Sequence, residues 1–298
     1  MKRNFIFPYR IKSIALIITS MLLFFASCKN KSEENIIVVS VEPQRAILEE
    51  IVGDRYKVVT MLAKGANPET FEPGMASRLQ LEQAKAYFTT GHLPFETKLK
   101  DAFNNENKTK FIDVSKGIEP VYGTHEHHHA DGTVHSHRGE PDPHVWTSVR
   151  NARIMALNML EAMKNIDPDG SEYYEERWNS LDHRLDSLDK AFSNQLSRPG
   201  INRSFAVWHP SLSYFARDYD LKQISVGYEN KDMPALTLQR IVENAKADSV
   251  SVFFFQQEFD SRQATSLNNE LGTELITINP LDYEWEEQLR NIVSQLCR

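Results

Sequence analysis

Histidine is concentrated in one short stretch of this sequence. Six of its ten histidines lie within residues 125–137, and they are His125, His127, His128, His129, His135 and His137. Neutral imidazole is the commonest protein ligand for zinc, copper and nickel. The stretch lacks the apolar residues that would build a core, so residues 122–140 are predicted to form a mobile loop that binds metal weakly.

His144 differs from these histidines in its surroundings. It lies between two prolines and a tryptophan in the segment PDPHVW at 141–146, just before a helical pattern begins. Proline stiffens the backbone, so this imidazole can be held in one position. The alternative is an uninvolved loop histidine beside a solvated polar insert. That is the commoner case for one histidine, and the neighbouring tract shifts the balance towards metal binding.

Short apolar strands alternate with helices around these segments. In the first half, strands are predicted at 36–41, 56–63, 86–89 and 110–114, with helices at 43–52, 75–83, 95–103 and 149–163. Near-continuous apolar strands that alternate with helices indicate a parallel sheet covered on both faces. In the second half, strands are predicted at 204–208, 221–226, 250–255 and 274–278, with helices at 212–217, 236–247, 260–271 and 285–296.

The longest predicted helix, 171–196, separates these two halves. Its apolar residues recur at spacings of three and four from Tyr174 to Leu196, which makes one continuous stripe. A helix buried within a single domain would show the same stripe. The predicted fold class is α/β, with two lobes joined by one long backbone helix. Each lobe has a four-stranded, mostly parallel sheet flanked by helices.

Residues of ligand type follow the predicted strands in both halves. They are Glu69, His92 and His144 in the first half, and His209, Gln256, Gln257, Asn279 and Asp282 in the second. Ligands of open parallel sheets bind beyond the carboxyl ends of the strands. Each residue has a structural alternative, such as a helix cap for Glu69 or His92, or a turn at Asn279-Pro280. Their joint placement favours a site in a cleft between the lobes.

The composition limits the other classes of function. The chain has 298 residues, 41% hydrophobic and 25% charged, which is ordinary for a globular protein. A formal charge of −7 and the lack of a basic stretch argue against nucleic acid as a partner. No His-Glu-x-x-His pattern lies on a predicted helix, as in a zinc hydrolase, and no Gly-x-Ser-x-Gly motif occurs.

The first 27 residues resemble the export signal of a bacterial lipoprotein. A basic start is followed by an apolar run that ends in Ala26, Ser27 and Cys28. Cys28 would carry the lipid, and Cys297, the only other cysteine, would have no disulfide partner. Any metal must then be held by nitrogen and oxygen. The predicted domains are a signal at 1–27, a tether at 28–35, lobes at 36–165 and 199–298, and the linking helix at 166–198.

Four segments resemble the metal-site segments of the zinc and manganese receptors of bacterial ABC importers. They are GANPETFEP at 65–73, DPHVW at 142–146, WHPSLSYF at 208–215 and ITINPL at 276–281. The resemblance covers nearly the whole mature chain. It implies a metal buried between two lobes and delivery to a membrane permease driven by a separate ATPase. A histidine-rich loop is typical of the zinc-selective members.

The resemblance implies that the metal ligands are Glu69, His144 and His209, with Asn279 at the fourth place. Most members have histidine where this chain has Glu69, and aspartate where it has Asn279. A glutamate oxygen suits zinc, whereas the neutral Asn279 is a poor ligand. Water, His92, Asp282 or Glu229 are the alternatives for the fourth position. A carboxylate is also expected to hydrogen bond His144 or His209.

Two imidazoles and one carboxylate favour zinc over manganese, which prefers more oxygen ligands. We therefore expect a monomeric zinc receptor at the cell envelope, on the periplasmic or extracytoplasmic face, that meets the membrane only through its lipid anchor. A manganese receptor of the same fold is the nearest alternative. A zinc-dependent hydrolase and a permease-independent metal scavenger or cell-adhesion protein are the alternatives from other classes.

Overall fold

A computed structural model describes residues 35–103, 109–128, 134–227, 235–259 and 261–298. The predicted signal, Cys28 and the tether up to residue 34 lie outside these ranges. Within the described residues, no helix has both the length and the apolar character that a bilayer crossing requires. Cys297, at the end of the last helix, is a free thiol.

The N-terminal lobe is built on a parallel sheet with the strand order β2-β1-β3-β4. Its strands are β1 (Ile36–Val39), β2 (Lys57–Thr60), β3 (Ala86–Thr89) and β4 (Lys110–Asp113). The helices between them are α2 (Glu42–Val52), α3 (Met75–Glu82) and α4 (Pro94–Ala102). All four residues of β1 and of β3 are buried, as expected for central strands covered on both faces. Because these four strands are parallel, the loops that follow them all leave the sheet at the same edge.

The C-terminal lobe repeats this plan with the strand order β10-β9-β7-β8, again parallel. The strands are β7 (Ser204–Val207), β8 (Lys222–Ser225), β9 (Val252–Gln256) and β10 (Glu274–Ile278). The helices are α7 (Ser213–Asp218), α8 (Ala235–Ala247), α9 (Ser261–Leu271) and α10 (Trp285–Leu296). The predicted fold class is confirmed: two four-stranded parallel sheets flanked by helices, with one long helix between the lobes.

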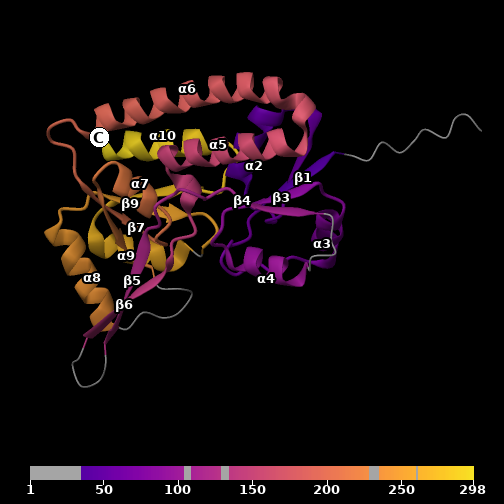
Figure 1. The fold of residues 1–298 in the computed structure, drawn as a ribbon. Helices are drawn as coiled ribbons and strands as arrows, with labels where there is room; N and C mark the ends of the chain where they lie inside the picture. Colours follow the sequence, from indigo (N-terminus) through magenta and orange to yellow (C-terminus); the bar gives the residue numbers. More distant parts are fainter. Residues whose placement is uncertain (1–34, 104–108, 129–133, 228–234, 260) are drawn as a thin grey trace, which may run out of the picture. The chain divides into compact units, whose positions relative to one another are not determined.

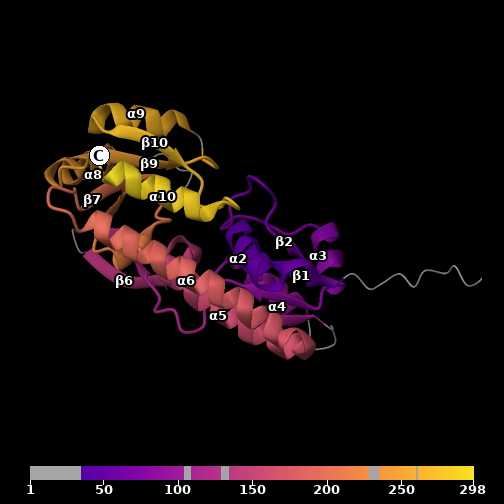
Figure 2. The same ribbon diagram turned by 90° about the horizontal axis from the view of Figure 1, so that it is seen from above.

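That long helix is α6 (Ser171–Leu196), which packs antiparallel along α5 (Val149–Ile166) and also contacts α2 of one lobe and α10 of the other (Figures 1 and 2). Its buried residues form the predicted stripe, namely Tyr174, Leu181, Leu185, Leu188, Phe192 and Leu196. Arg184 of α6 pairs with Glu50 of α2 and with Glu286 of α10. Helix α6 therefore connects the lobes through both apolar and charged contacts.

One hydrophobic core runs from the N-terminal sheet through α5 and α6 to α10 and one face of the C-terminal sheet. A smaller cluster covers the other face of the C-terminal sheet beneath α8 and α9. Close-packed interiors resist deformation. A shared core therefore restricts how far the two sheets can move apart. The boundaries predicted for the two lobes, 36–165 and 199–298, remain predictions.

The predicted loop at 122–140 is wrong for the residues that the structure describes there. Strands β5 (Tyr122–His128) and β6 (Val134–Pro141) pair antiparallel, with His125 opposite His137 and His127 opposite His135. Cross-strand hydrogen bonds supply the order that apolar residues do not, which a reading based on hydrophobicity alone cannot detect. His129 lies outside the described residues.

Candidate metal centre

His144 is the most rigidly held of the predicted ligands. It follows β6, directly before the short 3₁₀ turn Val145–Thr147, and is 4% exposed. Oδ1 of Asp142 accepts hydrogen bonds from the His144 backbone N–H and from its Nδ1, both at 2.8 Å. The predicted carboxylate partner of a histidine is thus confirmed as Asp142. Because Nδ1 donates to Asp142, the lone pair is left on Nε2, the nitrogen that remains for a ligand.

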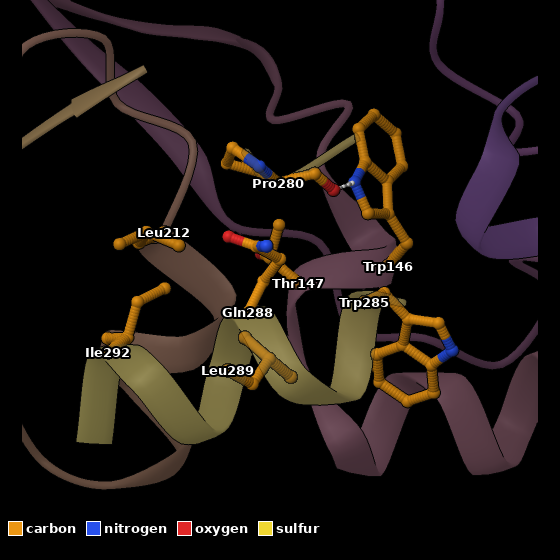
Figure 3. Close-up of a pocket in the computed structure, with 8 residues that line it drawn as sticks. All are labelled: Trp146, Thr147, Leu212, Pro280, Trp285, Gln288, Leu289 and Ile292. Atoms are coloured by element: carbon orange, nitrogen blue, oxygen red, sulfur yellow. Dashed lines mark hydrogen bonds between the residues drawn. The ribbon is translucent and has the colours of Figure 1, made fainter. Parts of the chain in front are cut away.

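Trp146, two residues further on, joins this segment to the C-terminal lobe. Its indole Nε1 donates to the carbonyl oxygen of Pro280 at 2.9 Å, and the two side chains line a small cavity of about 10 Å³ (Figure 3). Leu289 and Ile292 of α10 form the apolar wall of that cavity. The volume is about that of one water probe. The contact fixes the His144 segment against the opposite lobe.

His209 follows β7, as predicted, and is held by residues at the end of the neighbouring strand β9. Its backbone N–H donates to Oε1 of Gln256 at 3.1 Å, and Nε2 of Gln256 donates to its carbonyl oxygen at 2.6 Å. The ring of Phe259 stacks on the imidazole, with centroids 5.3 Å apart and an angle of 29°. The fully buried Gln256 thus holds the backbone of His209, and Phe259 covers its ring.

Glu69 lies in the loop after β2, where Oδ1 of Asn67 accepts a hydrogen bond from the Glu69 backbone N–H at 2.8 Å. This turn directs the side chain towards the other lobe. Its Oε1 is 3.2 Å from Nε2 of His209. The Glu69 side chain is 30% exposed and that of His209 is 14% exposed. The carboxylate is thus the most solvent-accessible member of the group.

Glu69, His144 and His209 each present one ligand atom, and these atoms all lie within 4.8 Å of one another. The rings of His144 and His209 are 5.0 Å apart between centroids. Two come from the N-terminal half of the chain and one from the C-terminal half. Side chains separated by up to 140 positions in sequence therefore meet at one point between the lobes, with the donor atoms that a divalent transition metal binds.

Burial and mutual attraction set the charges of this group. Burial opposes ionisation of Glu69, but the hydrogen bond with His209 and the nearby imidazoles outweigh it, so its pKa is lowered. Burial likewise opposes ionisation of Asp142. The charge and the hydrogen bonds of His144 outweigh burial, so the pKa of Asp142 is lowered. Burial disfavours the imidazolium form of His144, yet Asp142, Glu69 and Glu258 together raise its pKa. The carboxylates around the two imidazoles therefore give the site a negative electrostatic potential.

The other predicted ligands do not belong to this cluster. His92 and Asp282 are described, but neither of them lies in the group whose ligand atoms converge. Nδ2 of Asn279 donates to Oδ2 of Asp282 at 3.0 Å, and its Oδ1 accepts from the backbone N–H of Leu281 at 3.2 Å. Glu229 lies outside the described residues, as do the side chains of the histidines in β5 and β6.

A cavity of about 290 Å³ lies at the lobe junction, and none of the three side chains of this group lines it. The loop from Leu62 to Ala66 lines it from the N-terminal lobe, and Gln257, Glu258, Asn279 and residues 281–283 line it from the C-terminal lobe. Glu258 is a carboxylate that the sequence analysis did not single out, although its neighbours Gln256 and Gln257 were named. Its position two residues beyond the end of β9 was the available signal.

Two α/β lobes that share a core and converge on histidine and carboxylate side chains define a class of two-lobed metal-binding proteins. The sequence matches, over residues 37–295, the family described as zinc-uptake complex component A, periplasmic. The chain belongs to this family, which confirms the resemblance to metal receptors of bacterial ABC importers.

Named relatives are similar over most of this chain. The zinc-binding lipoprotein AdcA of Streptococcus pneumoniae strain R6 is 27% identical over 94% of this chain, which spans only 57% of AdcA. The high-affinity zinc uptake system protein ZnuA of Bacillus subtilis is 25% identical over 89% of this chain and 87% of its own length. A crystal structure of ZnuA superposes with a TM-score of 0.77 at 28% identity, covering 88% of this chain and 98% of that one.

Proposed function

We propose that this protein is an extracytoplasmic zinc receptor that delivers the metal to an ABC import permease and its ATPase. The observation that carries the proposal is the convergence of Glu69, His144 and His209 within 4.8 Å. Family membership supports it, as do the zinc-binding names of the relatives.

One separation between the ligand atoms of this group fits a zinc site. Ligands about 2.0–2.1 Å from a tetrahedral zinc ion lie roughly 3.3 Å from one another. Oε1 of Glu69 and Nε2 of His209 are already 3.2 Å apart. Two nitrogen donors and one oxygen donor favour zinc over manganese, which takes mostly oxygen ligands. Manganese is therefore the less favoured cargo.

Delivery requires that the ion can leave, and the structure suggests which part moves. The shared core and helix α6 hold the sheets together, whereas Glu69 lies on a partly exposed loop beside the 290 Å³ cavity. Release would follow from a small displacement of that loop and slight shear between helices. His144, held by Asp142 and Trp146, would stay in place.

Lipid attached to Cys28 would anchor a monomeric receptor at the cell envelope, on the periplasmic or extracytoplasmic face. The histidines of β5 and β6 would collect zinc weakly near the cleft, in the service of metal ion homeostasis. One structural neighbour is titled a laminin-binding adhesin, at 21% identity, which shows the fold alone.

Metal content and competitive zinc titration of the mature chain test the proposal. Glu69→Ala, His144→Ala and His209→Ala should each lose the one tightly held zinc, because each removes a donor atom. His183→Ala is the matched control, since this histidine is exposed on α6. Deleting residues 125–137 should lower the total zinc bound and leave the tight site. Retention of one tight equivalent in all three variants would reject this ligand set.

A further inference from the structure

The fourth ligand position is not supplied by Asn279 in this structure. Both polar groups of its side chain are used within its own loop, on Asp282 and on the backbone of Leu281. Its backbone N–H donates to Oε1 of Gln288 at 3.0 Å, which fixes the loop to α10. Asp282 is occupied in turn, because its Oδ1 accepts from the backbone N–H of Glu284 at 3.0 Å. This loop is therefore a closed hydrogen-bonded unit.

Glu258 lies in a turn that surrounds His209. Gln256, on one side of it, exchanges two hydrogen bonds with the backbone of His209, and Phe259, on the other side, stacks on the imidazole. The turn is closed by the Phe259 backbone N–H, which donates to the Gln256 carbonyl oxygen at 3.3 Å. Glu258 is thus carried by the same structure that positions a predicted ligand.

One carboxylate oxygen of Glu258 is enclosed without a partner. Among the described residues, five buried side-chain nitrogen or oxygen atoms make no hydrogen bond, and Oε2 of Glu258 is the only one on an ionisable group. An unpaired buried carboxylate oxygen costs free energy, and such an atom in a folded protein calls for a cause, such as a bound ion. Both imidazoles, of His144 and of His209, interact electrostatically with this carboxylate. The charge of Glu258 is therefore coupled to the charges of both imidazoles.

We propose that Glu258 is the fourth side chain that coordinates the metal, together with Glu69, His144 and His209. This assignment rests on the proposed metal-binding function. With Glu258 the direct ligands would carry two negative charges, which match the charge of a dication; with Glu69 alone they carry one, and Asp142 supplies a second only indirectly, through its hydrogen bond with His144. Glu258 is not part of the group within 4.8 Å, so a rotation of its side chain away from the cavity accompanies binding.

Zinc affinity of the mature chain, measured by competition with a chromophoric chelator, tests this assignment. We expect Glu258→Gln to weaken zinc binding at least about tenfold, because even an outer partner of a metal ligand is worth 10- to 100-fold in affinity. Glu258→Asp, which keeps a shorter carboxylate, should lose less. Asp282→Asn tests the competing carboxylate, and Glu270→Gln, an exposed residue of α9, is the control. X-ray absorption of the zinc-loaded Glu258→Gln protein should show one fewer protein oxygen ligand.

The outcomes separate this assignment from the proposed function. A larger loss in Glu258→Gln than in Asp282→Asn, with an unchanged melting temperature of the zinc-free protein, supports it. Wild-type affinity in Glu258→Gln, or a greater loss in Asp282→Asn, overturns the assignment and leaves the receptor function standing. If the wild-type chain itself holds no zinc tightly, the proposed function fails and the assignment fails with it. Should Glu258→Gln not fold, the affinity of Glu258→Asp decides.

Discussion

Glu96 and Glu258 are two glutamates enclosed near the ends of central strands, and their surroundings differ. Glu96, 4% exposed, accepts hydrogen bonds from Ser40, from both the backbone and the hydroxyl of Thr90, and from the backbone of Gly91. Glu258 leaves Oε2 without any partner. Glu96 is buried as a whole, whereas Glu258 is partly buried, with its Oε2 enclosed. A carboxylate oxygen without a hydrogen-bond partner can bind an ion. A carboxylate that already accepts several hydrogen bonds instead holds a loop in place.

The largest effect should come from removing the satisfied carboxylate. Glu96→Ala leaves several buried N–H and O–H donors unpaired, and each costs about 1–3 kcal/mol, so we expect a loss of roughly 3 kcal/mol or more in the free energy of unfolding. Glu258→Ala should change the free energy of unfolding of the zinc-free protein by only about 0.5 kcal/mol, because Oε2 of Glu258 has no hydrogen bond to lose. Urea unfolding of the zinc-free proteins measures both. Equal losses would break the contrast between the two glutamates.

The second effect is a pH dependence of stability that belongs to Glu96. Burial outweighs its hydrogen bonds and raises its pKa from 4.5 to about 7. The folded state therefore binds more protons than the unfolded state between these values, and the stability that Glu96 contributes is lost as pH rises from about 4.5 to 7. The change is at most about 3 kcal/mol by linkage. Unfolding of the wild type and of Glu96→Gln across pH 4.5–8 isolates it. A difference between the two that does not vary with pH contradicts this expectation.

The smallest effect concerns a third enclosed carboxylate, Asp142, whose partner is a predicted ligand. Asp142→Asn keeps an acceptor for His144 but removes the negative charge, so zinc affinity should fall by about 10- to 100-fold. Asp113→Asn is a matched control, because its Oδ1 likewise accepts a backbone N–H two residues on, at 2.9 Å from Ser115. Equal zinc affinity in both variants would show that Asp142 only shapes its turn.

The elements that position the site could be predicted from sequence because their signals are local. The stripe from Tyr174 to Leu196 predicted α6 within its observed bounds, and the apolar strands predicted both sheets. The convergence of Glu69 with His209 could only be inferred from strand order and family resemblance, since the loops meet across lobes. The β5-β6 hairpin was missed because cross-strand pairing between polar segments leaves no hydrophobic period.

The fourth metal ligand could not be predicted from sequence motifs. Asn279 was placed there by its position in a segment, but the fold uses its amide within the loop of Asp282. Glu258 has no motif of its own, and its enclosure depends on the turn that wraps His209. Whether a carboxylate oxygen has a partner is a property of tertiary packing, so the sequence alone does not reveal it.

The most direct measurement is a crystal structure of the zinc-loaded mature chain with an anomalous difference map at the zinc absorption edge. We predict one strong peak between the lobes, bonded to Glu69 and to Nε2 of both His144 and His209. A structure in which these three side chains contact no ion while the protein holds zinc tightly elsewhere would contradict the account.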